Sequence, residues 1–114
     1  MMFDQFDPAD DKMLQVIDNN GKVISKELMP HLSDDEMLKI YKDMLFVRTL
    51  DHMIVSYQRQ GRVFTYPPNY GQEAIGVAAG AVLRHDDWLV PAFRELGAWL
   101  AKGISVKEVF LYAM

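Results

Sequence analysis

A long amphipathic segment that begins at Ser33 is the feature that most constrains how this chain can fold. Ser33-Asp34-Asp35-Glu36 matches the capping-box pattern, in which serine and glutamate satisfy each other's backbone N–H groups at a helix start. The acidic residues also favour a first helical turn. Apolar residues then recur at steps of three and four, at Met37, Ile40, Met44, Val47, Leu50, Ile54 and Tyr57. The spacing predicts one helix that runs to about Gln60 and is ended by Gly61.

The length of this helix and the apolar pattern of the last residues both predict that the chain is the N-terminal piece of a larger protein. The helix would be roughly 40 Å long, more than a compact domain of this size requires, so we expect it to pack against a body outside these residues. A second capping box, Ser105 to Glu108, opens an apolar helix that is still running at Met114.

Composition and charge exclude several functional classes. Of the 114 residues, 50% are hydrophobic and 25% are charged, which is typical of a globular domain. A net charge of -4 disfavours a general nucleic-acid binder, which needs a basic surface. The chain has no cysteine, its acidic start does not resemble a secretory signal, and its apolar runs are too short to span a membrane. We expect a soluble cytoplasmic protein that binds neither nucleic acid nor membrane.

The remaining elements are predicted to be short. Residues 1–32 form an arm in which Met13–Ser25, around Asn20-Gly21, is expected to be a β-hairpin. After a proline-rich loop, the small residues of Gln72–Leu83 predict a helix in a tightly packed layer. A short strand is expected at Trp88–Ala92, followed by a short helix that stops at Gly103.

Few residues suggest chemistry by spacing alone. His31, His52 and His85 are scattered without metal-ligand spacing, and we expect them to be structural or solvated. Arg48 and Asp51 lie three residues apart and could form an ordinary intrahelical ion pair. Arg94 lies where the predicted strand gives way to a helix, and unpaired N–H groups at a helix start suit an anion such as phosphate. The other interpretation of Arg94 is a solvated side chain in a first turn.

Four stretches occur in the order and spacing of one known family: "LQVIDNNGKV", "LSDDEMLKIYKDMLFVRTLD", "YQRQGRVFTYPPNYGQEA" and "VPAFRELGAWLAKG". Together they resemble α subunits of the first component of thiamine-diphosphate-dependent 2-oxoacid dehydrogenase complexes, from about residue 13 to residue 114. The opening stretch followed by "MPHLSDDE" is most similar to the pyruvate dehydrogenase branch of that family. The resemblance implies an α/β fold, of which residues 33–114 are the start of the thiamine-diphosphate-binding domain, truncated and mostly helical.

The resemblance also implies roles for three residues. A tyrosine–arginine pair at the place of Phe93 and Arg94 helps to hold the diphosphate in that family, and here Phe93 lacks the hydroxyl and retains only packing. Arg94 would present a planar fork of donors to phosphate oxygens. Two roles stay open for Tyr66: its hydroxyl could contribute a hydrogen bond to the cofactor site, or the side chain could serve only in packing. The family's Mg²⁺-binding motif and its histidine-bearing loop are expected beyond residue 114, so the fragment alone should be inactive.

The implied activity is oxidative decarboxylation of pyruvate, with acetyl transfer to the lipoyl group of the second component. The implied partners are a β subunit, in a heterotetramer of two α and two β chains, and a dihydrolipoyl acyltransferase core. Two alternatives stay open from the residues. One is the α subunit of a branched-chain 2-oxoacid or acetoin dehydrogenase, and the other is a non-catalytic helical interaction module.

Overall fold

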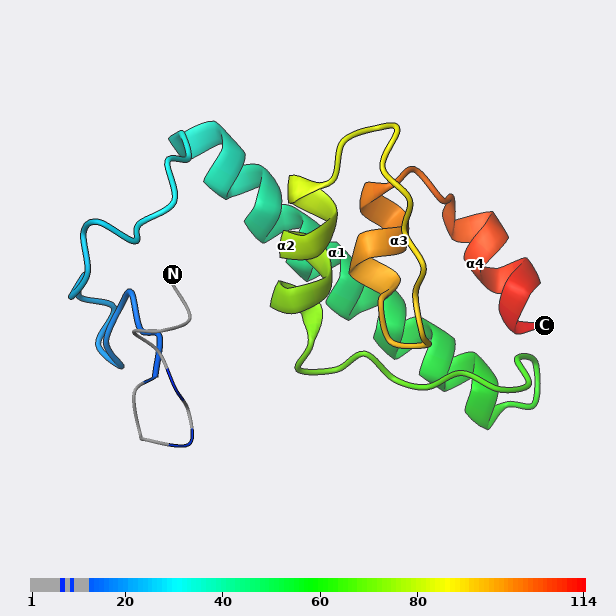
Figure 1. The fold of residues 1–114 in the computed structure, drawn as a ribbon. Helices are drawn as coiled ribbons and strands as arrows, with labels where there is room; N and C mark the ends of the chain where they lie inside the picture. The colour runs from blue at the N-terminus through cyan, green and yellow to red at the C-terminus, as the bar shows by residue number, and fades with distance from the viewer. Residues whose placement is uncertain (1–6, 8, 10–12) are drawn as a thin grey trace. The chain divides into compact units, whose positions relative to one another are not determined.

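The computed structural model describes residue 7, residue 9 and residues 13–114. The chain divides into two compact units, residues 1–32 and residues 33–114. Every helix of the described chain that is longer than one turn lies in the second unit (Figure 1). These helices are α1 (Asp34–Arg59), α2 (Glu73–Val82), α3 (Leu96–Ala101) and α4 (Val106–Ala113).

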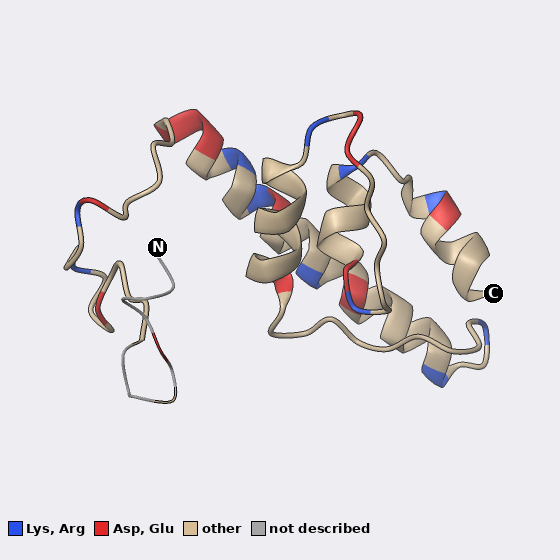
Figure 2. Cartoon of the chain, viewed as in Figure 1, with Lys and Arg blue, Asp and Glu red and all other residues tan. Residues whose placement is uncertain are grey.

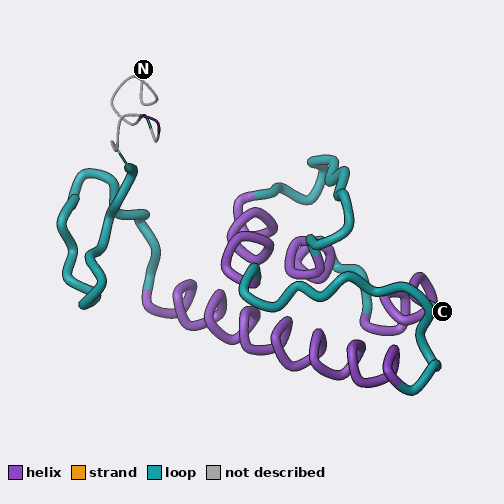
Figure 3. Tube along the Cα trace, turned by 90° about the horizontal axis from the view of Figure 1, so that it is seen from below, coloured by secondary structure: helices purple, strands orange, loops and turns teal. Residues whose placement is uncertain are grey.

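Helix α1 has the bounds that its capping box predicts. The Ser33 side chain accepts the N–H of Glu36, and the Glu36 carboxylate accepts the N–H of Ser33. Gly61 follows the helix with a φ of 71°, in the left-handed region that favours glycine. The predicted apolar face is also confirmed at its centre, where Val47, Leu50 and Ile54 are buried. The long helix therefore serves as the base on which α2 and α3 pack (Figure 3).

Helices α2 and α3 pack closely because small residues lie between them. A Cβ added to Gly97 would lie 2.8 Å from the backbone nitrogen of Val77, and one added to Gly80 would lie 2.4 Å from the Cβ of Ala101. Helix α2 also has no charged side chain after Glu73 (Figure 2). The tight packing predicted from the small residues is therefore present, and it fixes α3 against α2.

Helix α4 closes the core of this unit. Its own capping box, between Ser105 and Glu108, is formed as predicted. The backbone N–H of Phe64 donates to the carbonyl of Ala113 at 3.0 Å, which joins the loop after α1 to the end of α4. The core consists of Val47, Leu50, Ile54, Val63, Tyr66, Val77, Leu96, Val109 and Ala113.

The predicted β-hairpin at Met13–Ser25 is wrong. In the described part of this segment, pairing is limited to one antiparallel bridge between Ile17 and Val23. The carboxylate of Asp18 accepts the backbone N–H groups of Asn20 and Lys22, both at 2.8 Å. A side chain that captures these N–H groups favours a tight turn over a ladder, and a two-stranded ribbon is marginal by itself.

The predicted strand at Trp88–Ala92 is also wrong. The segment has no strand structure, and Trp88 and Val90 are 92% and 87% exposed. An extended run becomes a strand only where another strand pairs with it, and none lies beside it among the described residues (Figure 3). The described chain is thus mostly helical. None of its helices is long and apolar enough to cross a bilayer.

Candidate functional site

Arg94 lies on an exposed segment just before α3 and is held from one side. Its Nη1 donates to the carbonyl of Pro68, in the loop between α1 and α2. Nε and Nη2 have no hydrogen-bond partner among the described residues, so most of the guanidinium fork is free to bind an acceptor. The guanidinium carbon lies 5.5 Å from the centre of the Phe93 ring. Arg94 therefore remains available for an anion, in a partly fixed position.

Two of the backbone N–H groups near Arg94 at the helix start are already used. Helix α3 begins at Leu96, two residues after Arg94. The backbone N–H of Leu96 donates to Oδ1 of Asn69 at 3.1 Å, and that of Arg94 donates to the Glu95 carboxylate at 2.9 Å. These two backbone groups would therefore add nothing to the binding of an anion beside the Arg94 side chain.

Tyr66 is buried within a polar network. Its hydroxyl donates to Oδ1 of Asp51 at 2.7 Å and accepts from Nδ2 of Asn69 at 3.2 Å. Burial, and then the bond to Asp51, raise the pKa of the Tyr66 phenol above its ordinary range. The hydroxyl is thus neutral and occupied at neutral pH, and it fixes the loop after α1.

The structure brings Phe93 close to Tyr66. Both residues line a small cavity of about 30 Å³, together with Leu96 and Trp99. Phe93 as a whole residue is 60% exposed. The three residues that the sequence singles out therefore form one neighbourhood: Arg94 contacts the loop two residues after Tyr66, and Phe93 lies between that loop and solvent.

Sequence reasoning missed Asp51 and Asn69 as parts of this neighbourhood. Asp51 is 1% exposed, and Asn69 is 3% exposed. A signal for Asp51 was available, because it lies four residues after Val47 and three before Ile54, on the apolar face of α1. A carboxylate on such a face needs buried partners. No comparable pattern surrounds Asn69 in its loop.

The predicted ion pair between Arg48 and Asp51 is wrong. Arg48 instead makes two hydrogen bonds to the carboxylate of Glu73, the first residue of α2. The guanidinium carbon also lies 4.2 Å from the centre of the Tyr70 ring. The bond from Arg48, aided by the N–H of Gly71, holds the pKa of Glu73 at about 2. This pair ties the start of α2 to the middle of α1.

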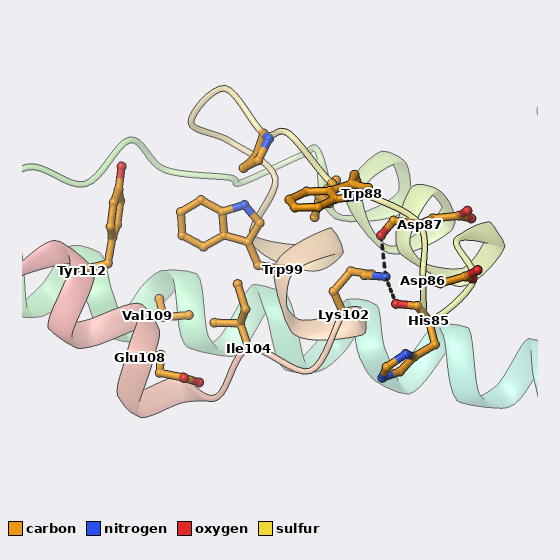
Figure 4. Close-up of a pocket in the computed structure, with 12 residues that line it drawn as sticks. His85, Asp86, Asp87, Trp88, Trp99, Lys102, Ile104, Glu108, Val109 and Tyr112 are labelled. Carbon is orange, nitrogen blue, oxygen red and sulfur yellow. Dashed lines mark hydrogen bonds between the residues drawn. The ribbon is translucent and has the colours of Figure 1, made fainter.

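A much larger cavity lies elsewhere, beside the segment that joins α2 to α3 (Figure 4). It measures about 720 Å³, and Trp88, Trp99 and Tyr112 contribute aromatic surface to it. At its edge, the Lys102 ammonium donates to the carbonyls of Arg84, His85 and Asp87 at 2.8–2.9 Å. All three donors of Lys102 are therefore used to hold the turn. Arg94, Phe93 and Tyr66 do not line this cavity.

Comparison with known proteins identifies the class to which this chain belongs. Residues 41–114 match the family described as "Dehydrogenase E1 component", whose members depend on thiamine diphosphate. Because the match covers more than half of the chain, the chain belongs to this family. The resemblance drawn from the four sequence stretches is confirmed.

Individual relatives of the chain are named as one particular subunit of this family. The chain is 42% identical over 95 residues to the pyruvate dehydrogenase E1 component subunit alpha of Acholeplasma laidlawii, an alignment that covers 83% of this chain and 28% of the relative. It is 33% identical over 102 residues to the protein of the same name from Staphylococcus aureus, covering 90% of this chain and 28% of that relative. The chain thus spans little more than a quarter of the length of these relatives.

Proposed function

We propose that this chain is part of the α subunit of a pyruvate dehydrogenase first component. The parent enzyme would oxidatively decarboxylate pyruvate and pass the acetyl group to the lipoyl group of a second component. The observation that carries this proposal is that relatives bearing this subunit's name match 83% and 90% of the chain. We further propose that residues 33–114 are the start of the domain that binds thiamine diphosphate.

The donor set near Arg94 fits one arm of a diphosphate site. The exposed guanidinium has donors without protein partners among the described residues, and a planar fork of N–H groups matches phosphate oxygens. Phe93 would add apolar surface beside it, and Tyr66 would act by fixing the loop that carries Pro68. When bound, thiamine diphosphate supplies carbanion chemistry that side chains lack. The role of Arg94 is to hold and orient the cofactor's anionic end.

The Mg²⁺ that accompanies the diphosphate needs ligands from other parts of the enzyme. The described residues contain no group of three or more histidine or acidic side chains placed to hold a metal ion. We place these ligands beyond residue 114. We also propose a β subunit and a dihydrolipoyl acyltransferase core as partners, in the cytoplasm.

The test of this function is turnover by the enzyme assembled from the α and β subunits, with a lipoyl domain of the second component supplied as oxidant and acetyl acceptor. We expect release of carbon dioxide from pyruvate that depends on added thiamine diphosphate and Mg²⁺, with slower release from 2-oxoisovalerate. Selectivity of this kind is a ratio of kcat/KM values for the two substrates. A ratio that favours 2-oxoisovalerate would assign the chain to the branched-chain enzymes. Turnover without added cofactor, after its removal by dialysis, would contradict the proposed chemistry.

A further inference from the structure

A buried carboxylate anchors the loop between α1 and α2. Asp51 makes no ion pair among the described residues, although it is 1% exposed. Its Oδ1 accepts the Tyr66 hydroxyl at 2.7 Å and the backbone N–H of Asn69 at 2.6 Å. A buried charge is costly unless it is hydrogen-bonded, so the loop must keep the conformation that provides these two donors.

Asn69 connects the anchored loop to α3 by hydrogen bonds. Its backbone binds Asp51, and its Oδ1 accepts the backbone N–H of Leu96, the first residue of α3. Its Nδ2 donates to the Tyr66 hydroxyl and to the carbonyl of Pro67, both at 3.2 Å. One side chain therefore joins the loop after α1 to the segment before α3, and these two segments approach each other where the second one turns into α3 (Figure 1).

Arg94 is fixed at both of its ends by this arrangement. Its backbone lies two residues before Leu96, which Asn69 binds, and its Nη1 donates to the carbonyl of Pro68, the residue before Asn69. A free arginine side chain samples many rotamers, and part of this rotamer entropy is lost whenever it binds an anion. A side chain that is already held has less to lose.

We propose that Asp51 and Asn69 are positioning residues for Arg94, holding its guanidinium ready for the cofactor's diphosphate through Leu96 and the Pro68 carbonyl. This inference rests on the proposed function, because it needs Arg94 to bind the diphosphate. Neither residue would touch the cofactor. Their removal should weaken binding only through Arg94.

The test is a double-mutant cycle on the assembled enzyme, with thiamine diphosphate affinity measured by equilibrium titration in the presence of Mg²⁺. The variants are Asn69→Ala, Arg94→Ala and the double substitution. We expect each single substitution to weaken binding about tenfold, and Asn69→Ala to change affinity by less than about twofold once Arg94 is absent. Where Asn69→Ala prevents assembly, Asp51→Asn, which preserves the shape of the side chain, replaces it in the same cycle.

Two controls separate positioning from general destabilisation. Ser33→Ala removes a capping interaction at the far end of α1, and Arg59→Ala removes an exposed arginine of its last turn. Both should leave the affinity at the wild-type value. If Asn69→Ala lowered thiamine diphosphate affinity equally with and without Arg94, or did not lower it at all, the positioning role would be overturned while the proposed function stayed intact. Unchanged affinity in Arg94→Ala would overturn the diphosphate role of Arg94, and the positioning role with it.

Discussion

Two carboxylates lie in the interior of residues 33–114, and each is compensated in a different way. Asp51 accepts hydrogen bonds from a hydroxyl and a backbone N–H, whereas Glu73 is bound by the guanidinium of Arg48. Both interactions join α1 to a part of the chain that follows it. These two buried carboxylates therefore help to fix the tertiary arrangement of residues 33–114.

Substitution of Glu73 by glutamine should destabilise the protein in a pH-dependent way. The pKa of Glu73 is held at about 2, below the ordinary 4.5, so the ionised carboxylate stabilises the folded state. This contribution is present above about pH 4.5 and is lost as the pH falls towards 2. We expect Glu73→Gln to lower the free energy of unfolding by about 1–3 kcal/mol at neutral pH, with the difference from wild type shrinking below about pH 4.5.

Denaturant unfolding of the intact subunit at several pH values measures this effect. Asp43→Asn is a matched control, because Asp43 binds Lys39 at 2.7 Å on the exposed surface of α1. An exposed pair of this kind contributes only a few tenths of a kcal/mol. A loss in Glu73→Gln no larger than that in Asp43→Asn would show that the pair with Arg48 is not a tertiary anchor.

At this scale, the sequence predicts which residues are near the candidate site better than it predicts their bonds. Arg94, Phe93 and Tyr66 do lie in one neighbourhood, yet the Tyr66 hydroxyl donates to Asp51, 15 positions away, and the Arg94 guanidinium donates to Pro68, 26 positions away. The same limit explains the wrong ion pair for Arg48. Its true partner, Glu73, is 25 residues away and is reached only after α2 packs on α1.

At the scale of elements, the pair α2 and α3 depends on residues that lack side chains. A Cβ on Gly97 would lie 2.8 Å from the Val77 nitrogen and 2.9 Å from Val77 Cγ2. One of these atoms belongs to the backbone, which cannot move aside as a flexible side chain does. This contact fixes the direction in which α3 runs, and with it the segment that carries Arg94.

Gly97→Ala should therefore force α2 and α3 apart. We expect the free energy of unfolding to fall by about 1–3 kcal/mol, as in other overpacked interiors. Gly76→Ala is the matched control in the same interface, since its nearest new contact would be 3.4 Å and alanine favours a helix interior. Denaturant unfolding of both variants checks the prediction. Equal stability of the two would contradict the close packing described here.

Elements that are determined locally could be predicted, and those that need a distant partner could not. The capping boxes at Ser33 and Ser105 are complete within four residues, and both helices begin where these boxes predict. The expected hairpin and the expected strand at Trp88–Ala92 both require a paired ladder. An apolar run does not reveal whether such a ladder exists.

At the scale of the whole molecule, much apolar surface is exposed at the end of α2, on the segment after it and on α4. Val82, Trp88 and Tyr112 are 81%, 92% and 78% exposed. Large exposed apolar patches are typical of surfaces that contact other protein. This exposed surface agrees with the proposal that the chain acts within an enzyme assembled from α and β subunits. It also agrees with the fact that the chain spans little more than a quarter of the length of its relatives.

The central claim is that Arg94 binds the diphosphate of the cofactor, and the most direct measurement is a structure of the assembled enzyme with thiamine diphosphate bound. We predict a guanidinium nitrogen of Arg94 at a charge-assisted hydrogen-bond distance from a phosphate oxygen, about 2.7–2.9 Å. The bond from Arg94 to Pro68 should persist in that structure. A guanidinium that points into solvent, with the diphosphate held by other residues, would contradict the account.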